Sequence, residues 1–271
     1  MGKLDVRNPL GWLERLLLYG PERSYRGTPE HLGMEYEDVF RETSDSVRIH
    51  SWLIRGPEKL VFLIFHGNGG NISVRLDQYR DLNERLGASV LAVDYRGYGQ
   101  SDGSPSEDGL YEDARTALEY VRREFPDSTV VVFGRSLGSA VASNLAQNNP
   151  HVAALILEAG LASIKEVMFE YSPWTKYSPM RFILRANYPT LEHIKNVHCP
   201  VLILHGTADE TVSHRNSERI FAAANKPKQL ELIEGGDHDY LDQVNPSEYY
   251  ELLDDFLRSS VPGVFSRQTT S

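Results

Sequence analysis

Residues 129–145 read TVVVFGRSLGSAVASNL, and this stretch decides the fold. The apolar residues 129–134 predict a strand that is buried on both faces, as in a parallel sheet. The small and apolar residues from 137 to 148 predict a helix. The intervening GRSLG at 134–138 predicts a sharp, strained turn from strand to helix, which pushes the hydroxyl of Ser136 out of the sheet edge.

The same alternation of strand and helix continues along the chain. Continuous apolar runs such as LVFLIF at 60–65 predict further buried strands. Two earlier strands, at 34–42 and 46–54, predict an antiparallel edge. The other expected strands are 89–95, 153–159, 201–205 and 230–234, and the other expected helices are 72–86, 107–124, 213–224 and 246–258. The pattern predicts an α/β fold with a mostly parallel sheet and helices on both faces.

Three segments depart from this alternation. Residues 1–30 predict an N-terminal extension, in which 8–19 (NPLGWLERLLLY) has the pattern of a short amphipathic helix. Residues 31–260 predict the main domain. An insertion at about 160–199, rich in aromatic and methionine residues, predicts a small lid over the sheet. Residues 261–271 predict a C-terminal tail.

The composition excludes some classes of protein. The formal net charge is −10 and no long Lys/Arg run occurs, which argues against a nucleic-acid partner. The single cysteine, Cys199, predicts a buried thiol in a reducing compartment. Because neither a secretory signal nor a run long enough to span a bilayer is visible, we expect a cytoplasmic protein. The N-terminal leucine stripe, formed by Leu10, Leu13 and Leu17, is expected to pack on its own domain. Contact of residues 9–19 with a membrane surface or with a partner protein is the alternative. The sequence indicates no oligomeric state.

The serine at the predicted turn needs a base, because a hydroxyl is a weak nucleophile by itself. For a serine at such a turn, the acid and then the histidine follow in chain order. Asp209 comes directly after the strand at 201–205 and is the predicted acid. His238 lies in a glycine-containing loop after the last strand and is the predicted base. The alternative base, His214, is expected in a helix, where it is poorly placed.

Four other carboxylates remain alternatives to Asp209. Glu210 is its neighbour, Glu158 ends an earlier strand, and Asp237 and Asp239 flank the predicted base. The common fate of any such acid is a solvated surface position.

The loop HGNGGN at 66–71 follows a buried strand, and its glycines let the backbone approach a ligand closely. The backbone N–H groups of Asn68 and Leu137 are the predicted donors to a developing oxyanion. A phosphate loop is excluded, because no Gly-Lys-Ser/Thr follows and Ile72 stands where a third glycine is needed. No metal is predicted, since the chain lacks a His-Glu-x-x-His motif and paired cysteines.

Five motifs stand in order along the chain: HGNGGN, DYRGYGQSDG (94–103), GRSLGS, HGTADETV and GGDH. Together they resemble the α/β-hydrolase superfamily, and most of all its short-lid serine esterases. The resemblance covers about residues 34–259. It implies an eight-stranded, mostly parallel sheet with a small lid, and no metal or organic cofactor. Haloalkane dehalogenases and epoxide hydrolases are similar but use an aspartate nucleophile, which Ser136 argues against.

The resemblance also implies the roles of individual residues. Ser136, Asp209 and His238 would form a catalytic triad, and Asn68 and Leu137 an oxyanion hole. The expected activity is hydrolysis of small-molecule carboxylic esters with short to medium acyl chains, through an acyl-enzyme. The side chains expected to contact the substrate are Tyr98, Met168, Phe169 and Trp174. A thioesterase, a lipase or peptidase with the same triad, and a non-catalytic binding protein on this fold remain the alternatives.

Overall fold

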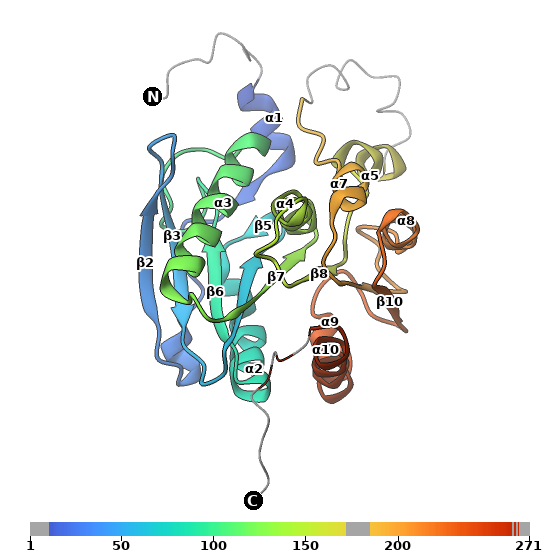
Figure 1. Ribbon diagram of the computed structural model, residues 1–271. Coiled ribbons are helices and arrows are strands. Elements are labelled where there is room, and N and C mark those ends of the chain that lie inside the picture. Colours follow the sequence, from blue (N-terminus) through green and yellow to red (C-terminus); the bar gives the residue numbers. More distant parts are fainter. Residues whose placement is uncertain (1–10, 172–184, 262, 264, 266–271) are drawn as a thin grey trace, which may run out of the picture.

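The computed structural model describes residues 11–171, 185–261, 263 and 265, and its centre is one sheet (Figure 1). The strands of this sheet are β2 (Glu37–Glu42), β3 (Arg48–Ile54), β4 (Leu60–Phe65), β6 (Ser89–Asp94), β7 (Thr129–Arg135), β8 (Ala154–Glu158), β9 (Val201–Gly206) and β10 (Lys228–Ile233). Their order is β10-β9-β8-β7-β4-β6-β3-β2, and β3 runs in the direction opposite to the other seven strands. The predicted eight-stranded, mostly parallel sheet is confirmed.

Helices cover both faces of the sheet. The longer ones are α2 (Leu76–Leu86), α3 (Glu107–Glu124), α4 (Leu137–Ala146), α8 (Arg215–Ala223) and α10 (Pro246–Ser260). Side chains of α3, α4 and α8 belong to the core on one face, and those of α2 and α10 to the core on the other. The shorter elements are η1 (Pro29–Leu32), η2 (Ile72–Arg75), η4 (Ile194–Asn196) and α9 (Leu241–Val244).

The buried strands set the position of everything that follows them. All six residues of β4 are buried, as a strand that is covered by helices on both faces requires. In the register of the sheet, Phe65 lies beside Gly134, and Arg135 lies beside Glu158. The loops that follow β4, β7, β9 and β10 therefore leave the same edge of the sheet, although they are far apart in sequence.

The N-terminal helix α1 (Gly11–Leu18) is turned differently from the prediction. Its buried residues are Glu14 and Leu18, whereas Leu16 and Leu17 are 72% and 43% exposed. The Glu14 carboxylate accepts hydrogen bonds from the backbone N–H groups of Arg185 and Ala186, and these bonds turn the acidic side of the helix inward. The prediction that the leucine stripe packs on the domain is therefore wrong for Leu17, and Trp12 is exposed as well.

A two-residue parallel pairing that the sequence did not indicate follows this helix. The strand β1 (Gly20–Pro21) pairs with β5 (Gly69–Gly70) in the HGNGGN loop. The Gly20 N–H donates to the carbonyl of Asn68, and the Glu22 N–H donates to that of Gly70. The described part of the predicted N-terminal extension is thus attached to the main domain at the edge where the loops meet.

The predicted lid is only partly separate from the body. Its described elements are α5 (Ile164–Tyr171), α7 (Thr190–His193) and η4. From Tyr188 onward the segment belongs to the core, with Ile194 and Val197 fully buried. Residues 188–197 of the predicted lid thus belong to the body of the domain, and 172–184 lie outside the described residues. At the other end of the chain, Val261 of the predicted tail is buried.

Candidate active site

Ser136 stands at a strained turn between β7 and α4. Its φ is 52° and its ψ is −118°, which is unfavourable for a residue with a side chain. A Cβ atom on Gly138 would lie 2.1 Å from the carbonyl oxygen of Phe65, so only glycine fits there. The turn lifts the serine hydroxyl out of the sheet edge, as predicted for a GRSLG sequence after a buried strand.

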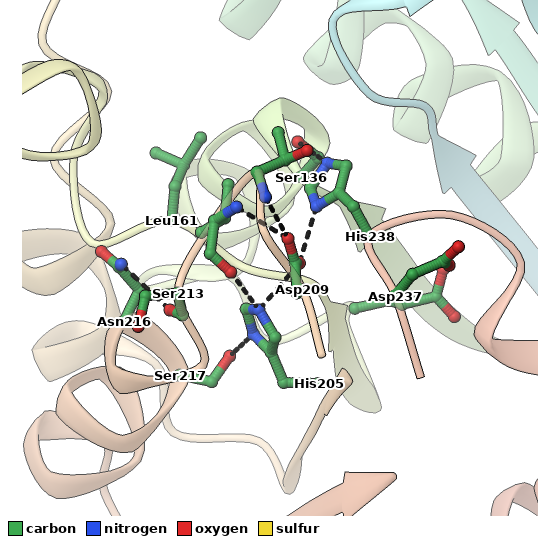
Figure 2. Close-up of polar contacts among 12 residues, drawn as sticks. Ser136, Leu161, His205, Asp209, Ser213, Asn216, Ser217, Asp237 and His238 are labelled. Carbon is green, nitrogen blue, oxygen red and sulfur yellow. Dashed lines mark hydrogen bonds and ion pairs between the residues drawn. The ribbon is translucent and has the colours of Figure 1, made fainter. Parts of the chain in front are cut away.

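The structure brings the three predicted triad residues together (Figure 2). The His238 Nε2 atom lies 3.1 Å from the Ser136 Oγ, and its Nδ1 atom lies 2.7 Å from the Asp209 Oδ2. A carboxylate can only accept, so Nδ1 carries the proton and Nε2 accepts from the serine hydroxyl. This is the arrangement in which an imidazole can remove the proton of an attacking serine.

Asp209 sits in a hydrogen-bonded, buried position. Its Oδ1 accepts from the backbone N–H groups of Thr211 and Val212, at 2.8 and 2.7 Å. Its Oδ2 also lies 3.0 Å from the Nε2 of His205. Burial raises the pKa of the Asp209 carboxyl, but hydrogen bonds from the two imidazoles and a backbone N–H outweigh it and hold that pKa well below its usual value. The acid is therefore ionised and fixed in orientation.

The alternative acids are engaged elsewhere. Glu158 is fully buried and accepts from the hydroxyl of Tyr249 at 2.5 Å. Glu210 is exposed, and Asp237 is exposed with its carboxylate directed away from the His238 ring (Figure 2). Asp239 forms ion pairs with arginines instead of the imidazole. The alternative base, His214, lies at the start of α8.

The two predicted oxyanion donors face the same cavity as the serine. Leu137 is the first residue of α4, where a backbone N–H has no partner inside the helix. Asn68 follows β4, and its carbonyl accepts from the Tyr98 hydroxyl at 2.8 Å and from the Gly20 N–H at 3.3 Å. These bonds fix the peptide plane on one side of the loop. The role of the Asn68 and Leu137 N–H groups as oxyanion donors stays a prediction.

The cavity beside Ser136 has a volume of about 500 Å³ and two different walls. Seven apolar or aromatic residues line it: Val74 and Tyr240, which neighbour Arg75 and Asp239 in sequence, and a group that we call the apolar wall, Leu137, Leu161, Ile164, Val167 and Val212. Its charged wall consists of Glu22, Arg26, Arg75, Arg135 and Asp239. The serine and His238 lie in the same cavity, so a bound molecule meets both kinds of surface.

None of the described residues predicted to contact the substrate is among those that line the cavity. Tyr98 is fully buried, and its hydroxyl holds the loop of Asn68 rather than lining the cavity. From α5 the cavity is lined by Ile164 and Val167, while Met168 packs against the core. Phe169, next along the helix, is half-buried and is not among the described lining residues. Trp174 lies outside the described residues.

Two residues at the site were not singled out from the sequence. The His205 ring is fully buried, and its Nε2 faces both Asp209 and the carbonyl of Val212, at 3.0 and 2.7 Å. Since both are acceptors, Nε2 carries the proton, and Nδ1 accepts from the hydroxyl of Ser217 at 2.6 Å. A histidine at the end of a buried strand, four residues before the acid, is the signal that could have identified it.

Arg135 is the second such residue. Its guanidinium donates to the backbone carbonyl of His238 at 2.5 Å and pairs with the buried Glu158 at 3.2 Å. It thereby links the strand that carries the nucleophile to the loop that carries the base. Its place directly before Ser136 was the available signal.

Neither a metal cluster nor a membrane-spanning helix is found among the described residues. They contain no group of three His, Cys, Asp or Glu side chains arranged to hold a metal ion. They also contain no helix whose length and apolar character would let it cross a membrane.

Comparisons with known proteins place this geometry in a family. A family model described as "Serine aminopeptidase, S33" matches residues 56–191 and 176–244. The α/β hydrolase domain-containing protein WAV2 of Arabidopsis thaliana is 37% identical over 238 residues, which are 80% of this chain and 76% of that protein. Protein bem46 of Schizosaccharomyces pombe is 35% identical over 241 residues, which are 85% of this chain and 79% of that protein.

Solved structures show the same fold. The Pyrococcus furiosus esterase Pf2001 has a TM-score of 0.76 at 18% identity, covering 90% of this chain and 98% of its own. An α/β hydrolase from Vibrio vulnificus has a TM-score of 0.76 at 23% identity, covering 92% and 94%. The predicted superfamily is thus confirmed, and the chain belongs to the α/β hydrolases, in the family described as serine aminopeptidase S33.

Proposed function

We propose that this hydrolase cleaves carboxylic esters through an acyl-enzyme on Ser136. The observation that carries the proposal is the continuous hydrogen-bonded line from the Ser136 Oγ through the His238 ring to the Asp209 carboxylate. A line of this kind activates a hydroxyl that is otherwise a poor nucleophile.

The reaction has two halves. In the first, His238 takes the proton as Ser136 attacks the ester carbonyl, and the N–H groups of Asn68 and Leu137 donate to the oxyanion. His238 then gives that proton to the leaving alcohol, and the acyl group stays on the serine. In the second half, water attacks the acyl-enzyme with the same base, and the serine is released. Asp209 stabilises the imidazolium in both halves.

Short to medium acyl chains are the proposed substrates. The apolar wall is formed by five side chains within a cavity of about 500 Å³, which leaves little room for a long chain. A series of p-nitrophenyl esters from two to sixteen acyl carbons tests this proposal. We expect the highest kcat/KM between about four and eight carbons, and a maximum at sixteen would contradict it.

Cleavage of an aminoacyl bond is the second candidate. The family description points to aminopeptidases, and the carboxylates of Glu22 and Asp239 line the cavity, where they can receive a substrate ammonium group. Hydrolysis of alanine and proline p-nitroanilides, compared with p-nitrophenyl butyrate, separates the two activities. An S-butyryl thioester in the same series tests the thioesterase alternative.

Loss of the nucleophile tests the proposal as a whole. Ser136→Ala should abolish both ester hydrolysis and labelling by a fluorophosphonate probe. Ser143→Ala is the matched control, because it removes a buried hydroxyl of the same helix that donates to the Ser139 carbonyl. A wild-type protein that takes no label would support the non-catalytic binding protein instead.

Contact with a membrane surface through residues 9–19 is a separate proposal. Trp12, Leu16 and Leu17 are exposed on α1 and support it. Sedimentation with anionic vesicles tests it, with Leu16→Glu as the variant. Protein that stays in the supernatant at every lipid concentration would contradict it.

A further inference from the structure

Arg75 and Arg135 are two buried guanidiniums that line the catalytic cavity. Their side chains are 6% and 10% exposed, and both belong to the charged wall. Burying a charge is costly unless it is paired and hydrogen-bonded. A buried cation that lines a cavity therefore calls for an anion.

The two arginines are paired unequally. Arg135 has a buried partner, Glu158, at 3.2 Å. The described carboxylate in contact with Arg75 is that of Asp239, at 3.1 Å, and this side chain is 57% exposed. The Arg75 Nη1 is buried, and no described atom accepts a hydrogen bond from it.

Asp239 itself bridges both guanidiniums through one oxygen atom. Its Oδ1 accepts from Arg75 and also from Arg135. A carboxylate that is more than half exposed can turn toward solvent when another anion takes its place beside the two buried guanidiniums. Asp239 therefore occupies a place that another anionic oxygen can take.

The guanidiniums that line the cavity outnumber the carboxylates that line it. Three guanidiniums and two carboxylates line it, in a chain whose formal net charge is −10. The third guanidinium, Arg26, is 59% exposed and pairs with the exposed Glu22. Arg135 also pairs with Glu158 behind the lining, so the charges balance while Asp239 stays in place, and the space that it leaves on turning away favours an anion.

The charged wall also lies on a defined side of the reacting bond. His238 must protonate the leaving alcohol, so the alcohol part of the ester lies toward the His238 loop. Asp239 is the next residue of that loop, and Arg135 donates to the His238 carbonyl. The apolar wall, which includes Leu137 of α4 and Ile164 and Val167 of α5, is left for the acyl part.

We infer that the cavity takes esters whose alcohol part ends in an anionic group, a carboxylate or a phosphate, which displaces Asp239 from Arg75 and Arg135. This inference rests on the proposed esterase function and names its substrate class. The anion accepts charge-assisted hydrogen bonds from the two guanidiniums, and Arg26 meets it at the rim. The acyl group then lies against the apolar wall, with the ester carbonyl at Ser136.

The test compares acetate release from esters of one chain length. The substrates are 4-acetoxybutanoate, 3-acetoxypropyl phosphate, the neutral 4-acetoxybutanamide and the cationic 3-acetoxypropyl-trimethylammonium. The measured quantity is the ratio of kcat/KM for each charged ester to that for the neutral amide. We expect a ratio of about tenfold or more for an anionic ester, as for charge-assisted hydrogen bonds, and a ratio below one for the cation. The two anionic substrates show whether carboxylate or phosphate is preferred.

Variants assign the preference to the arginines. Arg75→Gln should bring the anionic ratio close to one, and Asp239→Asn should raise it above that of the wild type. Arg80→Gln on α2 is the matched control, because Arg80 pairs with Asp77 and Asp81 outside the cavity and should keep the wild-type ratio. A wild-type ratio of one or less overturns the inference, and so does an unchanged ratio in Arg75→Gln. If Arg75→Gln does not fold, the ratio of Asp239→Asn decides, and a value at or below that of the wild type overturns it.

Binding separates this inference from the proposed function. Calorimetric titration of Ser136→Ala with 4-acetoxybutanoate and with 4-acetoxybutanamide needs no turnover. Tighter binding of the carboxylate that disappears in Ser136→Ala/Arg75→Gln supports the anion site even if wild-type protein cleaves none of these esters. Equal binding of the two compounds overturns the anion site even if esters are cleaved.

Discussion

Replacing Asp209 with Asn tests the proposed mechanism at its most constrained point. The two oxygens of the carboxylate accept from different donors, the Thr211 and Val212 N–H groups at Oδ1 and the two imidazoles at Oδ2. An asparagine has an NH₂ group in place of one of these oxygens, so this group faces either the two backbone N–H groups or the two imidazoles. Turned toward the backbone, the NH₂ group would oppose two N–H donors, at a cost of about 1–3 kcal/mol each.

Turned the other way, the NH₂ group meets the N–H of His205, which still has the Val212 carbonyl as its acceptor, so the amide nitrogen is expected to face the imidazoles. It then donates to the Nδ1 of His238, and the ring proton moves to Nε2, where it points at Ser136. A ring in this tautomer cannot accept the serine proton. The corresponding change in another serine hydrolase lowers kcat about 10⁴-fold, which corresponds to about 5 kcal/mol, and we expect a loss of that size here.

Hydrolysis of p-nitrophenyl butyrate measures the effect. The loss should appear in kcat, with KM changed little, because Asp209 is not among the described residues that line the cavity. Asp237→Asn, an exposed neighbour of the base, is the control and should stay within about twofold, as surface substitutions usually do. An Asp209→Asn protein with more than a tenth of the wild-type kcat would refute the reasoning.

The same variant has a second signature in stability. The folded protein lowers the pKa of Asp209, so the ionised carboxylate stabilises the fold above the ordinary aspartate pKa of about 4. That contribution is lost as the pH falls toward the lowered value. In urea unfolding, the wild type should be more stable than Asp209→Asn at pH 7, and the difference should shrink below about pH 4.

Three further predictions concern the surroundings of the site. Tyr98→Phe removes the donor to the Asn68 carbonyl and should lower kcat/KM about fivefold, the worth of one hydrogen bond of about 1 kcal/mol; an unchanged value would show that the loop needs no such support. Burial and the neighbouring Glu158 raise the pKa of Asp242 to about 6, so this acid destabilises the fold as the pH rises from about 4 through 6. Asp242→Asn should therefore raise the free energy of unfolding more at pH 8 than at pH 4, and the opposite order would contradict this. Leu63→Ala empties a fully buried position at the centre of the sheet and should cost about 2–5 kcal/mol in urea unfolding, with a loss under 1 kcal/mol counting against tight packing there.

The fold and the meeting of Ser136, His238 and Asp209 could be predicted because each rests on a local pattern. The run LVFLIF predicts β4 at its observed bounds, since a strand covered on both faces must be apolar throughout. The turn at Ser136 is fixed by two glycines and a preceding strand, all within a few residues. The order of acid and base along the chain then leaves few candidates for their partners.

What the sequence did not indicate depends on contacts between distant residues. The side of α1 that faces the domain is set by Glu14 and the backbone N–H groups of Arg185 and Ala186, about 170 positions away. An amphipathic pattern cannot reveal such a partner. The family resemblance predicts Tyr98 as a substrate contact, but its hydroxyl donates to the Asn68 carbonyl of the HGNGGN loop instead.

The short pairing of β1 with β5 has a consequence for anyone who handles this protein. It ties the first described helix to the peptide that precedes the cavity, through the Gly20 N–H and the Asn68 carbonyl. A tag, a label or a surface attached near that helix can therefore disturb the loop of Asn68, which lies beside the catalytic cavity. Turnover measured on amino-terminally immobilised protein should therefore be checked against protein held by its other end before the two are treated as the same enzyme.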